Sequence, residues 1–162
     1  MTDSATLDGG CACGAVRYRL AGPPMFVNCC HCTSCQTETG SAFAVNALIK
    51  ADRVVPLAGA PEPLPTPSES GRGQTVWRCP GCRVALWSNY SGAGPRIHFV
   101  RVGTLDRPAL CPPGAHIFAR SRLPWVHLPE DGAPVFDVYY DMAALWPAQS
   151  LARRAAARGE TT

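Results

Sequence analysis

The spacing of the cysteines constrains this chain more than any other feature of its sequence. Nine cysteines occur in 162 residues, and seven of them form three short groups: Cys11-x-Cys13, Cys30-x-Cys32-x-x-Cys35 and Cys79-x-x-Cys82. Residues 1–8 are polar and carry no signal-peptide pattern, and no apolar run approaches the roughly 20 residues that a membrane span needs. We therefore expect a cytoplasmic protein, in which thiols stay reduced and closely spaced cysteines bind metal.

The pair Cys79 and Cys82 gives the strongest local signal, because a Cys-x-x-Cys turn brings two thiolates to one ion. A structural zinc site needs four ligands, and Cys11 and Cys13, flanked by glycines, supply the other two. A redox Cys-x-x-Cys usually opens a helix after a strand, whereas this one lies between two strand-like segments. Arg83 follows the turn, where a left-handed backbone would be costly for a residue other than glycine.

The group Cys30, Cys32 and Cys35 predicts a second metal site, with three protein ligands and an open fourth position. An open position is typical of catalytic zinc. The alternative is a closed site completed by Cys29, His31 or Cys111. We expect Cys29 to face the core, because neighbouring strand residues point in opposite directions, and Cys111 to be a spare thiol. A proton relay at this site could use His31, Ser34 or Thr37, although His31 could equally point away.

Sixteen prolines and fifteen glycines predict many turns and short elements, hence a mainly β fold. We expect residues 1–8 to be disordered, 9–140 to form one zinc domain, and 141–162 to form a C-terminal helix or tail. A short helix should begin with a cap at Thr33 or Ser34 and end at Gly40, and 59–71 should be a surface loop. The expected strands and extended segments are 9–21, 25–30, 42–49, 54–57, 74–78, 84–90, 97–102, 115–119 and 135–140.

The charge distribution argues against nucleic-acid binding. The net charge is only +3, and the arginines are scattered except for Arg153, Arg154 and Arg158 near the C-terminus. A nucleic-acid footprint normally needs a clustered basic face. A nucleic-acid or membrane partner is therefore not expected.

The full cysteine pattern resembles the glutathione-dependent formaldehyde-activating (Gfa) enzyme family. The resemblance rests on the three cysteine groups in order and on further residues: Gly10, Gly14, Val16, Tyr18, Gly40-Ser41-Ala42-Phe43, Leu86-Trp87, His116-Ile117-Phe118, Ser121, Pro124-Trp125, Pro134 and Phe136. It implies a β-tent fold of short antiparallel strands, related to methionine sulfoxide reductase B and a Rab exchange factor. It also implies two zinc ions per chain: a structural one on Cys11, Cys13, Cys79 and Cys82, and a catalytic one on Cys30, Cys32 and Cys35.

The resemblance further implies a carbon–sulfur lyase or synthase that adds glutathione to formaldehyde, giving S-hydroxymethylglutathione. Ser41 and Phe43 are then expected at the substrate mouth, whereas His116 and Trp125 could equally be core residues. Gln36 stands where many relatives carry a basic residue, which would weaken the attraction of an anionic thiol. The alternative is a non-catalytic zinc module that binds a thiol or a protein. A homodimer is left open.

Overall fold

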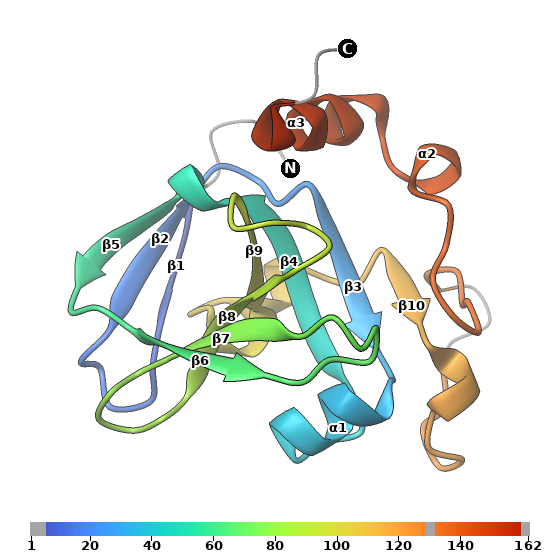
Figure 1. The fold of residues 1–162 in the computed structure, drawn as a ribbon, viewed down its shortest axis with the longest axis horizontal. Helices are drawn as coiled ribbons and strands as arrows, with labels where there is room; N and C mark the ends of the chain where they lie inside the picture. Colours follow the sequence, from blue (N-terminus) through green and yellow to red (C-terminus); the bar gives the residue numbers. More distant parts are fainter. Residues whose placement is uncertain (1–5, 129–131, 160–162) are drawn as a thin grey trace.

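The computed structural model describes residues 6–128 and 132–159; the expected disorder of residues 1–5 and the end of the C-terminal segment lie outside them. Within these ranges ten strands form two sheets (Figure 1). The smaller sheet has the order β1-β2-β5, with bounds Thr6–Gly10, Arg17–Ala21 and Val54–Ala58. The fold is mainly β, as the sequence predicts.

The larger sheet has the order β10-β3-β4-β9-β8-β7-β6. Its strands, in chain order from β3, are Phe26–Cys30, Ala44–Lys50, Glu62–Thr66, Gln74–Arg78, Ala85–Tyr90, Ile97–Arg101 and Ala115–Ile117. All neighbours in it are antiparallel except β10 and β3, which are parallel.

The helices are short. They are α1 (Thr33–Thr39), α2 (Met142–Leu145) and α3 (Ala148–Arg158), with four single 3₁₀ turns at Ala51–Arg53, Val102–Thr104, Pro108–Leu110 and Ala119–Ser121. No helix of the described chain is long and apolar enough to cross a membrane.

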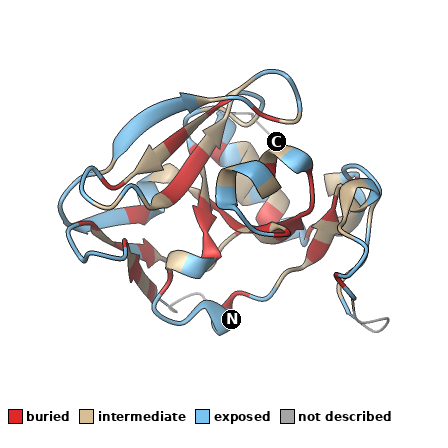
Figure 2. Ribbon diagram, turned by 90° about the horizontal axis from the view of Figure 1, so that it is seen from below, coloured by how far each residue is buried: buried red, intermediate tan, exposed pale blue. Residues whose placement is uncertain are grey.

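Alternation of apolar and charged residues explains how the smaller sheet faces the core. In β2, Tyr18 and Leu20 are buried, while Arg17 and Arg19 face outward and pair with Asp106 and Asp8. Successive side chains of a strand point to opposite faces, so one face of β2 packs on the core. The burial pattern of β1 alternates in the same way, whereas β4 and β8 of the larger sheet contain runs of consecutive buried residues. Figure 2 colours the buried positions red and the exposed ones pale blue.

The C-terminal segment packs on the core. Trp146 stacks on Phe26 at 5.3 Å between ring centroids, and Tyr140 and Ala157 are buried in the same cluster. The predicted C-terminal helix is present as α2 and α3, which lie over one end of the larger sheet (Figure 1).

Several predictions of local structure are wrong. Thr6–Asp8, expected to be disordered, pair with β2, and Glu62–Thr66, expected to be loop, form the edge strand β6. Prolines at alternate positions 63 and 65 are tolerated there because alternate residues of an edge strand turn their N–H groups away from the sheet. The segment 135–140 forms no strand: it makes an isolated bridge to His116 and accepts backbone hydrogen bonds from Phe118 and Ala119, and Trp125 is exposed.

Candidate metal centres and the adjoining pocket

Cys11, Cys13, Cys79 and Cys82 come together as the sequence predicts. Their sulfur atoms all lie within 4.8 Å of one another. The Sγ atom of Cys13 is 3.5 Å from that of Cys11 and 3.7 Å from that of Cys79. Four sulfurs bound tetrahedrally at about 2.3 Å from one ion are about 3.8 Å apart. The four residues therefore fit a metal ion of tetrahedral preference.

Two tight turns shape this cluster. The backbone N–H of Val16 donates to Cys11 Sγ at 3.3 Å, and the N–H of Arg83 donates to the carbonyl of Cys79 at 3.0 Å. Arg83 has φ 62°, the left-handed conformation in which a residue with a Cβ is strained. The hydrogen bond between Arg83 and Cys79 forms even though Arg83 has this strained backbone conformation.

The thiols of this cluster differ in their tendency to ionise. Backbone N–H groups of Val84 and Cys13 lower the pKa of Cys82 to about 6. The backbone N–H of Ala15 lowers the pKa of Cys13, but hydrogen bonds of its thiol with Cys11, Cys82 and Cys79 outweigh this and raise the pKa to about 11. The cluster therefore favours some thiolates before any cation is present.

Cys30, Cys32 and Cys35 form the second cluster, with sulfur atoms within 4.8 Å of one another and all three residues buried. Hydrogen bonds from the Cys30 and Cys35 thiols, aided by the backbone N–H groups of Cys35 and Ser34, lower the pKa of Cys32 to about 3. The same bonds raise the pKa of Cys30, and that of Cys35 rises to about 11. The cluster is thus a thiolate held by two thiols, a donor set that suits a soft or borderline cation.

Helix α1 presents two of these three cysteines. Its N-cap is Cys32, whose Sγ accepts from the Cys35 N–H at 3.3 Å, and not Thr33 or Ser34 as the sequence suggested. Gly40 ends the helix in the left-handed conformation, as predicted. A sulfur thus takes the role that a hydroxyl usually has at this position.

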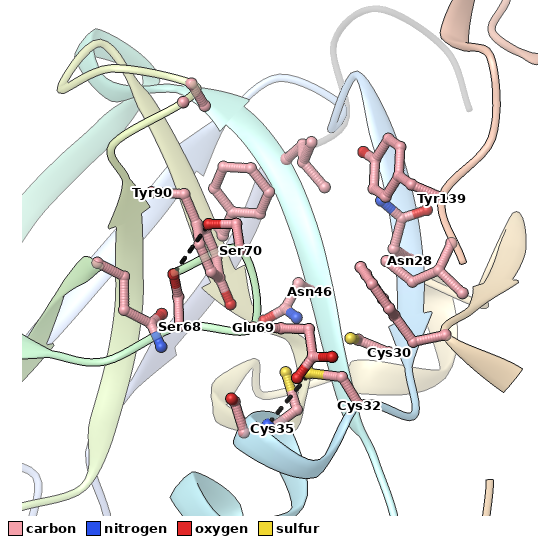
Figure 3. Close-up of a pocket in the computed structure, with 18 of the residues that line it drawn as sticks. Asn28, Cys30, Cys32, Cys35, Asn46, Ser68, Glu69, Ser70, Tyr90 and Tyr139 are labelled. Atoms are coloured by element: carbon pink, nitrogen blue, oxygen red, sulfur yellow. Dashed lines mark hydrogen bonds between the residues drawn. The ribbon is translucent and has the colours of Figure 1, made fainter. Parts of the chain in front are cut away.

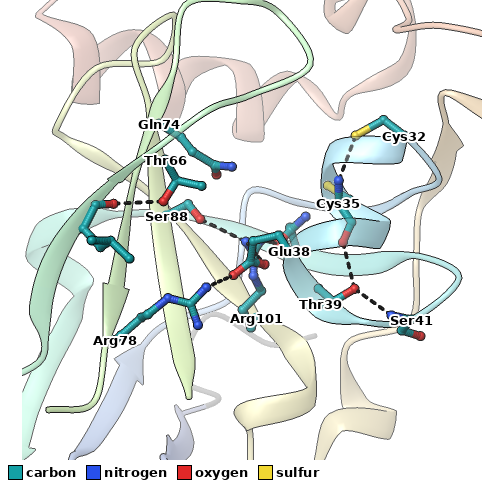
Figure 4. Close-up of polar contacts among 12 residues, drawn as sticks. Cys32, Cys35, Glu38, Thr39, Ser41, Thr66, Gln74, Arg78, Ser88 and Arg101 are labelled. Carbon is teal, nitrogen blue, oxygen red and sulfur yellow. Dashed lines mark hydrogen bonds and ion pairs between the residues drawn. The ribbon is translucent and has the colours of Figure 1, made fainter. Parts of the chain in front are cut away.

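The carboxylate of Glu38 anchors α1 to the larger sheet. It is 5% exposed and accepts from Arg78 at 2.6 Å and from Arg101 at 2.9 Å (Figure 4). Arg101 also donates to Ser88 at 3.1 Å. Because Cys35 lies one turn before Glu38, these ion pairs hold the three-cysteine cluster against the sheet.

The three-cysteine cluster opens into a pocket of about 430 Å³, which we call the three-cysteine pocket (Figure 3). Its lining is mostly apolar, from residues such as Leu48, Ile97 and Phe99. Polar atoms come from Asn28, Asn46, Ser34, Tyr90 and the loop 68–72, and Arg72 and Arg154 add positive charge. The loop 68–72 is held by the ion pair of Glu69 with Arg120 at 3.2 Å.

Ser41 and Phe43, predicted at the substrate mouth, do not line this pocket. The reason is that α1 separates them from it: Cys32 and Cys35 lie at its N-terminal end, whereas Ser41 and Phe43 follow its C-cap. Ser41 is exposed, and Phe43 lines a different pocket beside Glu38 and Arg78. Of the proposed proton relays, Ser34 lines the three-cysteine pocket and Thr37 is exposed.

His31 also points away from the three cysteines. Its Nε2 is 3.0 Å from Nδ1 of His116 and 3.7 Å from Sγ of Cys29, so these three residues form a separate group in which Cys29 and His31 are buried and His116 is half-buried. Burial lowers the pKa of His31 to about 4 and also lowers that of His116. Cys29 is buried, as expected, and Cys111 belongs to none of the described metal-ligand groups.

Gln36 has a structural role rather than an electrostatic one. Its Nε2 donates to the carbonyls of His31 and Ser121 at 2.8 and 2.9 Å. Gln36, the residue after Cys35, therefore holds the backbone behind the cluster and is not part of the pocket wall. The positive charges beside the pocket are Arg72, which the sequence did not single out, and Arg154, which belongs to the arginine group near the C-terminus.

Two asparagines of the pocket wall, Asn28 and Asn46, were also missed. Asn28 precedes Cys30 by two residues, so strand alternation alone places both on one face. The position of Asn46 needs the register of β3 with β4, which pairs it with Asn28. No short sequence motif predicts this register of β3 with β4.

Comparison with known proteins gives a family match, a curated relative and a solved structure. The family profile described as "GFA: Glutathione-dependent formaldehyde-activating enzyme" matches residues 6–121. A Halomonas elongata protein named "Putative glutathione-dependent formaldehyde-activating enzyme" is 30% identical over 129 residues, which cover 75% of this chain and 80% of that protein. A crystal structure of a Rhodobacter sphaeroides protein has a TM-score of 0.44 and 18% identity, covering 79% of this chain and 98% of the other.

Proposed function

Because the chain belongs to the glutathione-dependent formaldehyde-activating enzyme family, we propose that it is a zinc-dependent carbon–sulfur lyase or synthase. In this proposal the four-cysteine cluster holds a structural zinc and the three-cysteine cluster a second, catalytic one. The substrate is a thiol adduct such as S-hydroxymethylglutathione, formed from glutathione and formaldehyde. All nine cysteines are free thiols, which suits the reducing conditions of a cytoplasm.

One observation carries the proposal: the three-cysteine cluster opens into a pocket of about 430 Å³. A cluster of four protein ligands would be closed, whereas three leave one side for a reactant. The pocket is large enough for a small molecule and is walled mainly by apolar side chains. A site that served only to stabilise the fold would not need this space.

The reaction is an addition whose atoms balance without a further reactant. The sulfur of the thiol forms a bond to the carbonyl carbon, the π electrons of the carbonyl move to its oxygen, and the thiol proton ends on that oxygen. Zinc, when bound, keeps thiols ionised at neutral pH and polarises a carbonyl.

The chain's own residues position the reactants. The apolar wall, including Leu48 and Phe99, keeps bulk water from the reacting carbon, and the Ser34 hydroxyl lies at the pocket for proton transfer. Arg72 and Arg154 suit the carboxylates of a glutathione molecule.

The first test is zinc content per chain, measured by metal analysis. We expect two zinc ions in the wild type and one in Cys32→Ser, with the variant still folded. Cys111→Ser is the matched control, because Cys111 is equally buried but lies outside both clusters. A wild type with one zinc, or a Cys32→Ser variant with two, would contradict the assignment.

The second test is turnover. The exchange between glutathione plus formaldehyde and their adduct, followed by NMR at equilibrium, should be faster with the wild type and the Cys111→Ser protein than with Cys32→Ser. If glutathione binds without any acceleration of the exchange, the chain is a thiol-binding module and the enzyme proposal is wrong.

A further inference from the structure

Two buried asparagine side chains lie next to each other on the wall of the three-cysteine pocket. Asn28 of β3 and Asn46 of β4 are directly opposite in the antiparallel register and are 2% and 3% exposed. Both line the pocket beside Cys30 (Figure 3). Side chains in directly opposed positions have Cβ atoms about 5 Å apart. The two amides therefore face one ligand position.

The chemistry of the neighbouring groups fixes which way each amide points. Arg101 can only donate hydrogen bonds, and its Nη1 donates to Asn46, so the atom that it contacts is Oδ1. Trp146 Nε1 likewise can only donate, and it donates to the Tyr140 hydroxyl at 2.8 Å. The hydrogen of that hydroxyl is then given to Oδ1 of Asn28, at 2.8 Å.

Both oxygens are thus used by the protein, and the NH₂ groups are left for the pocket. No described residue accepts a hydrogen bond from Nδ2 of Asn46. The amide of Asn28 interacts with the Tyr139 hydroxyl, which uses at most one of its two hydrogens. Both residues line the pocket, so a ligand that enters it displaces water from these N–H groups. A donor that loses water and gains no acceptor costs free energy, so this wall is suited to a ligand that brings an acceptor.

We propose that Asn28 and Asn46 are substrate-binding residues whose amide N–H groups hold the oxygen atom of the thiol adduct. The identity of the adduct rests on the proposed function; the donor pair itself does not. The aldehyde oxygen gains negative charge as the carbon–sulfur bond forms, and preorganised N–H donors stabilise such an oxygen. Because neither amide is charged, the pair favours a carbonyl or alkoxide oxygen over a cation.

The test compares two stable glutathione derivatives by calorimetry with the full-length wild type. S-acetylglutathione carries a carbonyl oxygen where S-isopropylglutathione carries a methyl group, and the two are similar in size. We expect the acetyl derivative to bind about tenfold more tightly, as one or two buried hydrogen bonds would give. Equal affinities would overturn the proposal without any variant.

Asn28→Asp and Asn46→Asp are nearly isosteric and keep an oxygen for Tyr140 and Arg101, but they replace the NH₂ donors with an acceptor. Either change should reduce the tenfold preference to about one or reverse it. Ser88→Ala is the matched control: it removes another partner of Arg101 outside the pocket and should keep the preference. Asp variants that fold and retain the preference would assign it to another group and overturn the proposal.

If the proposed function is wrong, the binding experiment gives a different result. If neither glutathione derivative binds, glutathione is not the carrier, and the same acetyl and isopropyl groups on N-acetylcysteamine replace them. A preference for the acetyl group there, lost in both Asp variants, supports the donor pair with another thiol. No preference, or no binding, on that smaller carrier overturns the donor pair.

Discussion

At the scale of single residues, His98 makes the fold sensitive to acid. Its Nδ1 faces the Nδ2 donor of Asn89 at 2.9 Å, and its ring stacks on Trp87. A proton on Nδ1 would therefore meet another donor, and burial lowers the pKa of His98 from 6.5 to about 4. The folded state therefore favours the neutral form of His98.

The sign of the pH dependence follows from these two pKa values. The unfolded chain binds this proton near pH 6.5 and the folded chain only near pH 4, so stability is lost as the pH falls between them. The loss for His98 should be at most about 3 kcal/mol. His98→Gln, which can still accept from Asn89, should flatten this part of the curve in thermal unfolding measured from pH 7 to pH 4.

The difference in pH dependence between the wild type and His98→Gln reports the effect of His98 alone, because loss of metal from protonated thiols destabilises both proteins alike. Parallel curves for the wild type and His98→Gln would show that His98 is solvated in the folded state and would contradict the prediction.

At the scale of secondary-structure elements, Glu38 decides whether α1 stays on the sheet. Its carboxylate is 5% exposed and Arg101 is 8% exposed, so removing the negative charge leaves a buried guanidinium without its partner. We expect Glu38→Gln to lower the free energy of unfolding by about 3 kcal/mol, the lower part of the range for breaking a buried pair. Denaturant unfolding measures this.

The same variant should also bind metal more weakly at the three-cysteine cluster, because Cys32 and Cys35 are carried by α1. When a chelator is added, Glu38→Gln should lose one of its metal ions earlier than the wild type does. Glu62→Gln is the control, since its pair with Arg83 is 60% and 68% exposed and should contribute under about 1 kcal/mol. Similar losses in both variants would argue against a buried anchor.

The elements also show what the sequence can predict. Local alternation predicted β2, and the Cys-x-x-Cys turn predicted the β7–β8 hairpin, because both depend on neighbours along the chain. The edge strand β6 was missed because its prolines are typical of loops.

Residues brought together by pairing could not be found in this way. The two cysteine clusters were predictable because thiols are chemically distinctive, whereas Asn28 and Asn46 become a pair only through the register of β3 with β4. Ser41 and Phe43 do not line the three-cysteine pocket for the same kind of reason: closeness to Cys35 in sequence does not put them on the same side of α1.

At the scale of the whole molecule, the four-cysteine cluster connects the two sheets. Cys11 and Cys13 follow β1 of the smaller sheet, and Cys79 and Cys82 lie between β7 and β8 of the larger one. Cys13 and Cys79 are 66 positions apart in sequence. A metal bound here links the two sheets of the folded chain and is released when its ligands separate on unfolding, so its binding free energy adds to the free energy of unfolding.

The two clusters should consequently differ in what they contribute to stability. The double variant Cys11→Ser/Cys13→Ser removes two of the four ligands and should lower the free energy of unfolding by about 4 kcal/mol when free zinc is about a thousand times the dissociation constant of the site. Cys32→Ser should cost less, because its cluster joins only β3 and α1, and Glu38 holds α1 independently. Denaturant unfolding of both variants, with zinc content measured in parallel, compares them. A larger loss for Cys32→Ser would mean that the second cluster, and not the first, holds the molecule together, and its open side would then have to serve the fold rather than a substrate.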